Sequence, residues 1–422
     1  MKRIVLLLLF IFLFLNKGFA AEPELVTVRI DDRDRTFYRY VPQSNNAENP
    51  SAVFICLHGL GRNGEDFFSL MDLSALADEY NSIILAPNAI REEDEELIEK
   101  LQGYAPQFPI EAVWGCKMNM KITVFDIPFG DDIIPQWDIF NEEFNKSVND
   151  NKFISTLISD VKMNYPVKNK EVFLIGMSMG SYMAYNYILS VNFTKIAGVI
   201  TIAGSMSENM STGVSAKVAL CDFHSEDDQV IPYAGSYELT VPYNDDFLKA
   251  RVTMGMDKTE VINSWVGKNG ASSDVEETVF EDSGTGKSAI KYVYPSTSGK
   301  EVIHYKISGI GHAESMSKGA GDSMDYGEEI AEFLKAHMTP PVSTGINHLK
   351  GSSIKVFPNP AEDYIYISAE DVSNFMVIGM DGRKYLEGKG QTRINIQSLP
   401  SGIYFLRIVT NTRVCVERFV KK

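Results

Sequence analysis

Short apolar runs, each followed by glycine or by polar turn residues, recur along most of the chain. They include Ala52–Leu57, Ile83–Leu85, Val172–Ile175 and Val218–Cys221, and a further run, Val302–Ile307, alternates apolar and polar positions. Stretches long enough for a helix separate most of them. Strands that alternate with helices indicate a mostly parallel sheet with helices on its faces. We therefore expect one α/β domain over residues 21–338, a length that is within range for an α/β enzyme.

The pattern changes after residue 338. A linker composition over Thr339–Gly345 gives way to short alternating strands from residue 354 onward. The expected strands are Tyr364–Ser368, Phe375–Ile378, Arg393–Ile396 and Tyr404–Val409, with turn signals such as Asp381-Gly382 between them. Strands of this length and spacing predict a small all-β sandwich over residues 354–422, joined to the first domain by a linker at 339–353.

The beginning of the chain has the pattern of a secretory signal. A basic start, Met1-Lys2-Arg3, precedes the unbroken apolar run Ile4–Leu15, and small residues lead up to Ala20. We expect a signal peptide over residues 1–20 that is cleaved after Ala20. The apolar run is shorter than the ~20 residues that a spanning helix needs, which disfavours the alternative of a membrane anchor. No transmembrane segment is expected in the mature chain.

The most informative segment is the turn Gly176-Met177-Ser178-Met179-Gly180, which lies between a predicted strand and a predicted helix. A G-x-S-x-G sequence in this setting is the pattern of a nucleophile elbow, where a strained turn lifts the serine hydroxyl above the sheet. The two glycines have no Cβ to clash where strand and helix come close. The motif alone also occurs by chance, so an ordinary turn serine is the alternative to a nucleophile.

A glycine-rich loop, His58-Gly59-Leu60-Gly61, ends the strand at Ala52–Leu57. In hydrolases with a serine elbow, a backbone N–H from such a loop joins the N–H of the residue after the serine, and together they hold the oxyanion of the tetrahedral intermediate. We expect Leu60 and Met179 to supply these two donors.

Two further strand ends carry an acid and a base. The strand at 218–221 runs into an acidic loop closed by Val230-Ile231-Pro232-Tyr233, and the strand at 302–307 ends in Gly309-Ile310-Gly311-His312. The order Ser, Asp, His, each after a strand, is that of an α/β-hydrolase catalytic triad. Ser178 would attack an acyl carbonyl, His312 would take and return the proton, and an aspartate would orient His312.

Alternatives remain for the acid and the base. Asp222, Glu226 and Asp227 lie close to Asp228, and a cluster of acids in a loop is often only a solvated surface. Among the other histidines, His58 is expected to be structural and His304 to be a packed or exposed strand residue. His337 and His348 lie near a helix end and in the linker, which leaves His312 as the base.

These segments resemble the secreted esterase family that includes feruloyl esterases and polyhydroxybutyrate depolymerases, over roughly Val26–His337. Besides the elbow, the resemblance is carried by Asn149–Ile154, His224–Tyr233, Trp265–Gly270 and Gly309–His312. It implies that the acid is the aspartate two residues before the apolar pair and proline, which is Asp228, and that the base is His312. Ala271 stands where the family often has a cysteine, so a disulfide at that point is not expected.

The tail resembles the C-terminal sorting domain of the type IX secretion system of Bacteroidetes. The matching residues are Val356–Ala361, Gly379–Arg383, Leu399–Tyr404 and the terminal Lys421-Lys422. The resemblance implies passage through the periplasm and outer membrane with the type IX machinery as partner, then removal of the tail with release or surface attachment. The alternative for the tail is a carbohydrate-binding β-module.

Charge, cysteine content and two insertions indicate which partners, disulfides and pocket residues to expect. The net charge of −16 disfavours nucleic acid and polyanions such as acidic polysaccharides as partners. If any of the four cysteines pair, Cys116 with Cys221 is the expected bridge. The segments 91–136 and 243–300 look like insertions that either shape an acyl pocket or fill a satellite core with their aromatic residues. No cofactor and no metal site is expected, because no ligand spacing or phosphate loop is present.

The sequence thus predicts a secreted serine esterase. Its expected substrates are small or polysaccharide-linked carboxylic esters, with feruloyl or acetyl groups, or short polyesters. A serine peptidase on the same fold would share the triad, so ester and amide substrates would separate the two. A noncatalytic surface-binding protein on a hydrolase scaffold is the alternative from another class.

Overall fold

A computed structural model gives the protein's structure. It describes residues 22–71, 73–104, 107, 109–116, 120–125, 128–129, 132–133, 137–142, 144–190, 196–210, 217–243, 246–281, 284–312, 324–339, 355–369, 372–379, 383–410 and 414–422. The chain divides into two compact units, residues 1–341 and 342–422. The predicted signal peptide and nearly all of the predicted linker lie outside the described residues, so these two boundaries stay predictions.

The main unit is built on a ten-stranded sheet with the order β1-β2-β4-β3-β9-β10-β11-β16-β15-β14. The strands are β1 (Glu24–Ile30), β2 (Arg33–Tyr40), β3 (Ser51–Leu57), β4 (Ser82–Pro87), β9 (Val167–Met177), β10 (Gly198–Ile202), β11 (Ala219–Ser225), β14 (Glu276–Phe280), β15 (Ser288–Tyr294) and β16 (Val302–Ser308). The central strands from β4 to β16 are parallel. Strands at both edges are antiparallel. The predicted mostly parallel α/β sheet is confirmed.

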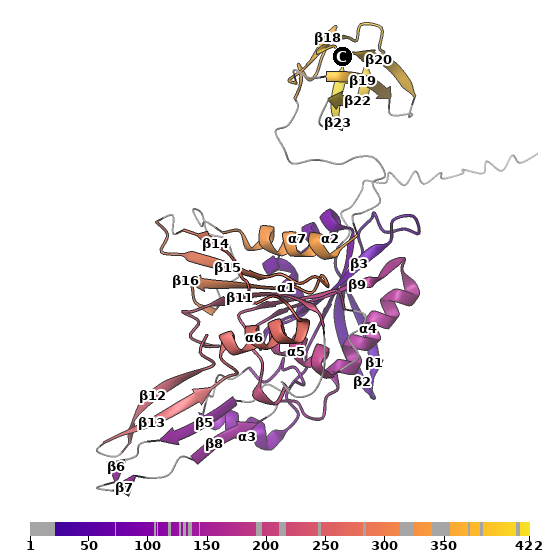
Figure 1. Cartoon of the computed structure of the whole chain (residues 1–422). Coiled ribbons are helices and arrows are strands. Elements are labelled where there is room, and N and C mark those ends of the chain that lie inside the picture. The colour runs from indigo at the N-terminus through magenta and orange to yellow at the C-terminus, as the bar shows by residue number, and fades with distance from the viewer. Residues whose placement is uncertain are drawn as a thin grey trace, which may run out of the picture. The chain divides into compact units, whose positions relative to one another are not determined.

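Helices cover both faces of this sheet (Figure 1). One face carries α1 (Gly64–Met71), α2 (Leu73–Tyr80) and α7 (Tyr326–His337), and the other carries α4 (Asp150–Asn164), α5 (Met179–Ser190) and α6 (Lys258–Asn269). The central strands are buried on both sides, which is why they read as unbroken apolar runs in the sequence. Among the described helices, none is long and apolar enough to cross a membrane.

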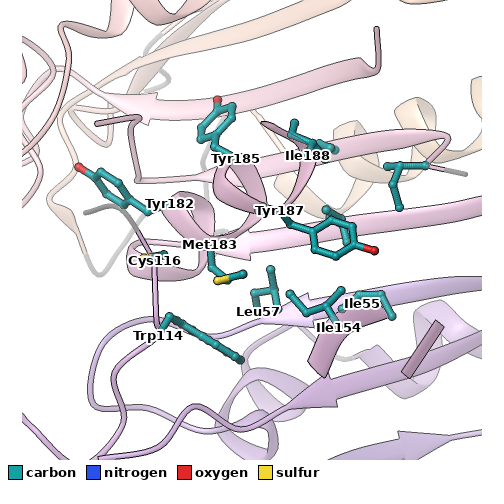
Figure 2. Close-up of a cluster of buried hydrophobic side chains, with 14 of the residues drawn as sticks. Ile55, Leu57, Trp114, Cys116, Ile154, Tyr182, Met183, Tyr185, Tyr187 and Ile188 are labelled. Atoms are coloured by element: carbon teal, nitrogen blue, oxygen red, sulfur yellow. The ribbon is translucent and has the colours of Figure 1, made fainter. Parts of the chain in front are cut away.

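Each face of the sheet has its own hydrophobic core. Figure 2 shows part of one of them, with Met183 and Tyr187 of α5 near Leu57 of β3. Cys116 belongs to this core, whereas Cys221 of β11 belongs to the core on the opposite face. Because the sheet lies between them, the expected Cys116–Cys221 bridge is wrong: both cysteines are buried and neither is in a disulfide.

A second sheet lies outside the main one, at the lower left of Figure 1. Its order is β12 (Ser236–Tyr243), β13 (Asp246–Thr253), β5 (Met120–Phe125) and β8 (Trp137–Glu142), all antiparallel. The short strands β6 (Pro128–Phe129) and β7 (Asp132–Ile133) and the helix α3 (Glu95–Tyr104) come from the same part of the chain. The two predicted insertions therefore pair with each other, through β5 and β13. The second insertion also supplies α6, β14 and β15.

The tail unit is the predicted all-β sandwich. Its two sheets have the orders β17-β18-β21 and β20-β19-β22-β23. The strands are β17 (Val356–Phe357), β18 (Tyr364–Ile367), β19 (Val372–Gly379), β20 (Lys384–Lys389), β21 (Arg393–Asn395), β22 (Gly402–Thr410) and β23 (Val414–Lys421). Burial alternates along β19 and β22, and Ile365, Val377 and Leu406 lie fully buried in one core. Period-two alternation is the reason why these strands were visible in the sequence.

Candidate active site

The G-x-S-x-G turn forms a strained elbow between β9 and α5. Ser178 has a φ of 53°, which a residue with a Cβ rarely adopts. A Cβ on Gly176 would lie 2.4 Å from the carbonyl oxygen of Gly180, and one on Gly180 would lie 2.0 Å from that of Leu57. Both glycines are therefore required by close backbone approach. The turn places the serine hydroxyl at the N-terminus of α5, where the helix dipole favours negative charge.

Ser178, His312 and Asp228 meet in one hydrogen-bonded chain. Ser178 Oγ lies 2.9 Å from His312 Nε2, and His312 Nδ1 lies 2.8 Å from Asp228 Oδ2. The other carboxylate oxygen of Asp228 accepts the N–H groups of Val230 and Ile231, both at 2.8 Å. The imidazole thus faces a hydroxyl on one side and a fixed carboxylate on the other, which is the arrangement needed to accept the serine proton.

The neighbouring aspartate has a different place. Asp228 is 5% exposed, whereas Asp227 is exposed and accepts the N–H of Gly309 at 2.7 Å. Burial would raise the pKa of Asp228, but the hydrogen bond and charge of His312 and the Ile231 N–H hold that pKa below its ordinary value. Asp228 therefore stays ionised while it is bonded to the imidazole.

The glycine-rich loop after β3 lies against Ser178. A Cβ on Gly59 would lie 3.2 Å from the Cβ of Ser178, so a larger residue would press on the serine. Leu60 and Met179 both line the same pocket as Ser178. Within the described chain neither backbone N–H is hydrogen-bonded, and Met179 is the first residue of α5, where N–H groups have no partner in the helix.

His58 supports this loop, and both of its ring nitrogens contact backbone groups. Its Nε2 accepts the N–H of Ala89 at 3.0 Å, and its Nδ1 donates to the carbonyl of Gly59 at 2.7 Å. Burial lowers the pKa of His58 to about 4, which keeps the ring neutral. Trp114 packs on the ring and donates its indole N–H to the carbonyl of His58 at 2.9 Å. Trp114, from the first insertion, thus belongs to the main core and braces the loop.

A pocket of about 620 Å³ opens in front of Ser178 and His312. Its apolar wall is formed by Phe67, Leu70, Phe144, Met177, Val230, Ile231 and Met254. The second insertion contributes Met254, at the end of β13, to this wall, whereas none of the described lining residues comes from residues 91–136. The contribution of α1 was not predicted from the sequence. A signal was present, because Asn63, two residues after the glycine-rich loop, is a helix-capping residue whose Oδ1 accepts the N–H of Asp66.

A second group of buried polar residues lies in the same region and was also missed. Asp222 accepts hydrogen bonds from Lys258 Nζ and His304 Nδ1, both at 2.9 Å. Burial would raise the pKa of Asp222, but the charge of Lys258 and the bond from His304 hold it well below its ordinary value. His224 is fully buried in the same group. Among the described residues, no group of three His, Cys, Asp or Glu is arranged to hold a metal ion.

Comparison with known protein families gives two matches. Residues 132–259 match the phospholipase/carboxylesterase family, and residues 355–422 match the secretion system C-terminal sorting domain. The first match includes Ser178 and Asp228 but ends before His312. A search of the curated proteins finds no match. The main unit thus carries a carboxylic ester hydrolase domain, and the tail is a type IX sorting domain, so the protein is secreted or attached to the cell surface.

Several solved structures are similar to the chain. An acetyl xylan esterase from Aspergillus awamori is 11% identical, with a TM-score of 0.45, and the alignment covers 74% of this chain and 99% of that one. The esterase PE8 is 13% identical with a TM-score of 0.38, covering 71% and 97%. The poly(3-hydroxybutyrate) depolymerase LpqC from Bordetella parapertussis is 13% identical with a TM-score of 0.33, covering 49% and 67%.

Proposed function

We propose that the main unit is a serine esterase that works through an acyl-enzyme. The observation that carries the proposal is the hydrogen-bonded chain from Ser178 Oγ through His312 to the buried Asp228, at the edge of a pocket. Ser178 attacks the ester carbonyl while His312 takes its proton. His312 then protonates the leaving alcohol, and water attacks the acyl-enzyme with His312 again acting as base.

The backbone N–H groups of Leu60 and Met179 are the proposed oxyanion donors. Both residues line the pocket beside the serine, and their N–H groups are not used in hydrogen bonds elsewhere in the described chain. Donors that are already oriented stabilise the developing negative charge without reorganising during the reaction. The close approach of Gly59 to Ser178 brings the loop that contains Leu60 next to the turn that contains Met179, which supports this assignment.

The pocket favours an apolar acyl group. Most of its wall is aliphatic, aromatic or thioether carbon, from α1, the acid loop and Met254. Its charged residues, Arg62 and Asp66, are both exposed and of opposite sign, so they create no strong preference for a charged acyl group. We therefore place uncharged acyl groups, such as acetyl, short hydroxyalkanoyl or feruloyl, among the proposed substrates. The alcohol part is a sugar residue or a second hydroxyacid unit.

A paired set of substrates tests the reaction class. Nitrophenyl esters and methyl hydroxycinnamates, each compared with the amide of the same acyl group, should show hydrolysis of the esters and little hydrolysis of the amides. Faster turnover of the amides would support the serine peptidase. The absence of turnover with every ester and amide would support the noncatalytic binding protein.

The apolar wall gives a prediction for specificity. Leu70 is 45% exposed and lines the pocket, so Leu70→Asp should fold normally. A carboxylate there should lower kcat/KM about tenfold for butyrate or hydroxycinnamate esters, because about 1.4 kcal/mol of apolar contact is lost, and should lower it less for acetate. Leu25→Asp is the matched control, since Leu25 is 55% exposed and lies on β1. Equal effects of both substitutions would contradict the assignment of this wall.

The separate tail unit gives a prediction for transport of the enzyme to the cell surface. It has its own core and forms a separate unit, so a chain that ends at residue 338 should fold and hydrolyse esters at close to the full-length rate. In the native host the same truncation should leave the enzyme in the periplasm. Cell fractionation and an ester assay measure the two effects. Lost activity in a folded truncated chain would assign substrate binding to the tail, and normal surface delivery would exclude the sorting role.

A further inference from the structure

His224 is a buried imidazole that the proposed relay does not use. It lies near the end of β11, and its side chain has no solvent exposure. Its Nε2 lies 2.8 Å from the carbonyl oxygen of Ile231 and 3.7 Å from Asp228 Oδ2, while its Nδ1 lies 3.1 Å from the carbonyl oxygen of Gly204. The ring thus spans the space between the loop of the acid and the end of β10.

Both carbonyl partners of His224 belong to segments that form the site. Ile231 is in the acid loop, and its own N–H donates to Asp228 Oδ1. Gly204 follows β10 and lies directly behind the elbow, because a Cβ on Gly204 would lie 2.6 Å from the carbonyl oxygen of Ser178. A shift of the His224 ring would therefore displace the Asp228 carboxylate, which faces His312.

The surroundings of the ring determine how many protons it carries. Asp222 and Asp228 face it with negative charge, Lys258 with positive charge, and the ring of Tyr233 meets it edge-on at 5.8 Å. Burial and the neighbouring Lys258 lower the pKa of His224 to about 4, so the ring is neutral at neutral pH and has one N–H. We assign that proton to Nε2, because its separation from the carbonyl oxygen of Ile231 is the shorter one and because the carbonyl oxygen of Gly204 already accepts a hydrogen bond from Lys258 Nζ.

We propose that His224 is a positioning residue for the catalytic acid. By donating Nε2–H to the carbonyl of Ile231, it fixes the loop whose N–H groups hold Asp228, so that Asp228 Oδ2 stays on His312. This inference rests on the proposed serine mechanism. It assigns to His224 an effect on proton transfer and none on substrate binding, because His224 is not among the residues that line the pocket.

The test is His224→Phe, which keeps a ring of similar size and removes the donor. We expect kcat to fall about 10- to 100-fold, less than the loss that follows removal of the acid itself, while KM stays within about twofold. In the pH dependence of kcat/KM, the fall in rate on the acidic side (the acid limb) reports protonation of His312. This limb should move to lower pH, because an imidazole that faces a displaced carboxylate is harder to protonate. A purely structural role would lower Tm without moving that limb.

Two further variants control for packing. In His224→Gln, the side-chain amide supplies an N–H donor in place of the imidazole. This variant should keep most of kcat, and its acid limb should lie at the same pH as in the wild-type enzyme. His304→Phe removes a histidine from the same buried group, one that bonds Asp222 and Tyr233, and should lower Tm without moving the limb. If His224→Phe does not fold, His224→Leu takes its place.

These experiments distinguish a failure of the positioning role of His224 from a failure of the proposed serine mechanism. Wild-type kcat and an unmoved acid limb in a donor-free variant would overturn the positioning role, and so would a glutamine variant no better than the donor-free one. Ser178→Ala, measured in the same assay, reports on the mechanism itself. An active alanine variant would remove the basis of the proposed function, whereas an inactive one leaves only the role of His224 to be judged.

Discussion

Ser178→Ala is expected to abolish ester hydrolysis and labelling by a fluorophosphonate probe. The serine oxygen is the proposed nucleophile, and His312 Nε2 is placed to take its proton. Loss of a triad serine leaves only the ~10³–10⁴-fold catalysis over water that binding and the oxyanion donors supply. Steady-state kinetics and mass spectrometry of the labelled peptide measure the two effects.

Ser69→Ala is the matched control for this experiment. Ser69 is exposed and lines the same pocket, so its replacement should leave labelling and kcat near the full values. Near-normal hydrolysis by the Ser178→Ala variant, with folding verified by Tm, would rule out the covalent serine mechanism and favour a different nucleophile.

Asp228→Asn is expected to lower kcat by about 10⁴-fold, whereas Asp227→Asn should change it little. Asp228 Oδ2 accepts the Nδ1 proton of His312, and an asparagine that presents its NH₂ group there would favour the wrong tautomer. The carboxylate of Asp227 accepts only the N–H of Gly309 in the described contacts, and an asparagine carbonyl can still accept that bond. The two variants differ by one position along the chain and give the sharpest test of the acid.

A larger loss of kcat in Asp227→Asn than in Asp228→Asn would identify Asp227 as the catalytic acid instead. Equal and small effects would show that His312 is oriented by another group. Stability should be measured beside activity, because Asp228 also accepts two backbone N–H groups of its own loop. An asparagine can keep one carbonyl on those donors, so the predicted loss is mainly in kcat and only slightly in Tm.

Much of the main fold could be predicted because its signals are local. The runs Ala52–Leu57 in β3, Val172–Ile175 in β9 and Ala219–Cys221 in β11 are apolar without interruption, since these parts of the strands are buried on both faces. The elbow was also visible as a local motif. Gly176 is required by a contact within the turn, with Gly180, whereas Gly180 is required by its approach to Leu57 of β3. The four-stranded outer sheet was not predicted as such, because it joins β5 to β13, strands that lie far apart in the sequence.

The parts of the site that depend on tertiary contacts were harder to predict from the sequence. The pairing of Cys116 with Cys221 was wrong because the sequence does not show on which face of the sheet each thiol lies. The link between His224 and Ile231 spans only seven residues, yet its importance depends on Gly204 and Asp228, which the fold brings to the same ring. The distinction between Asp227 and Asp228 likewise depends on the direction in which each carboxylate leaves the loop.

The sheet order also makes the assembly of the proposed site depend on contacts between distant parts of the chain. Ser178 and His312 are separated by 134 residues, and β16, the strand that precedes the histidine, pairs with β11 only after the whole second insertion has been made. Such long-range pairing forms late and slowly compared with local contacts. On the proposed mechanism, a partly folded chain would therefore present Ser178 without His312 beside it. Hydrolysis would then require that β16 has docked against β11.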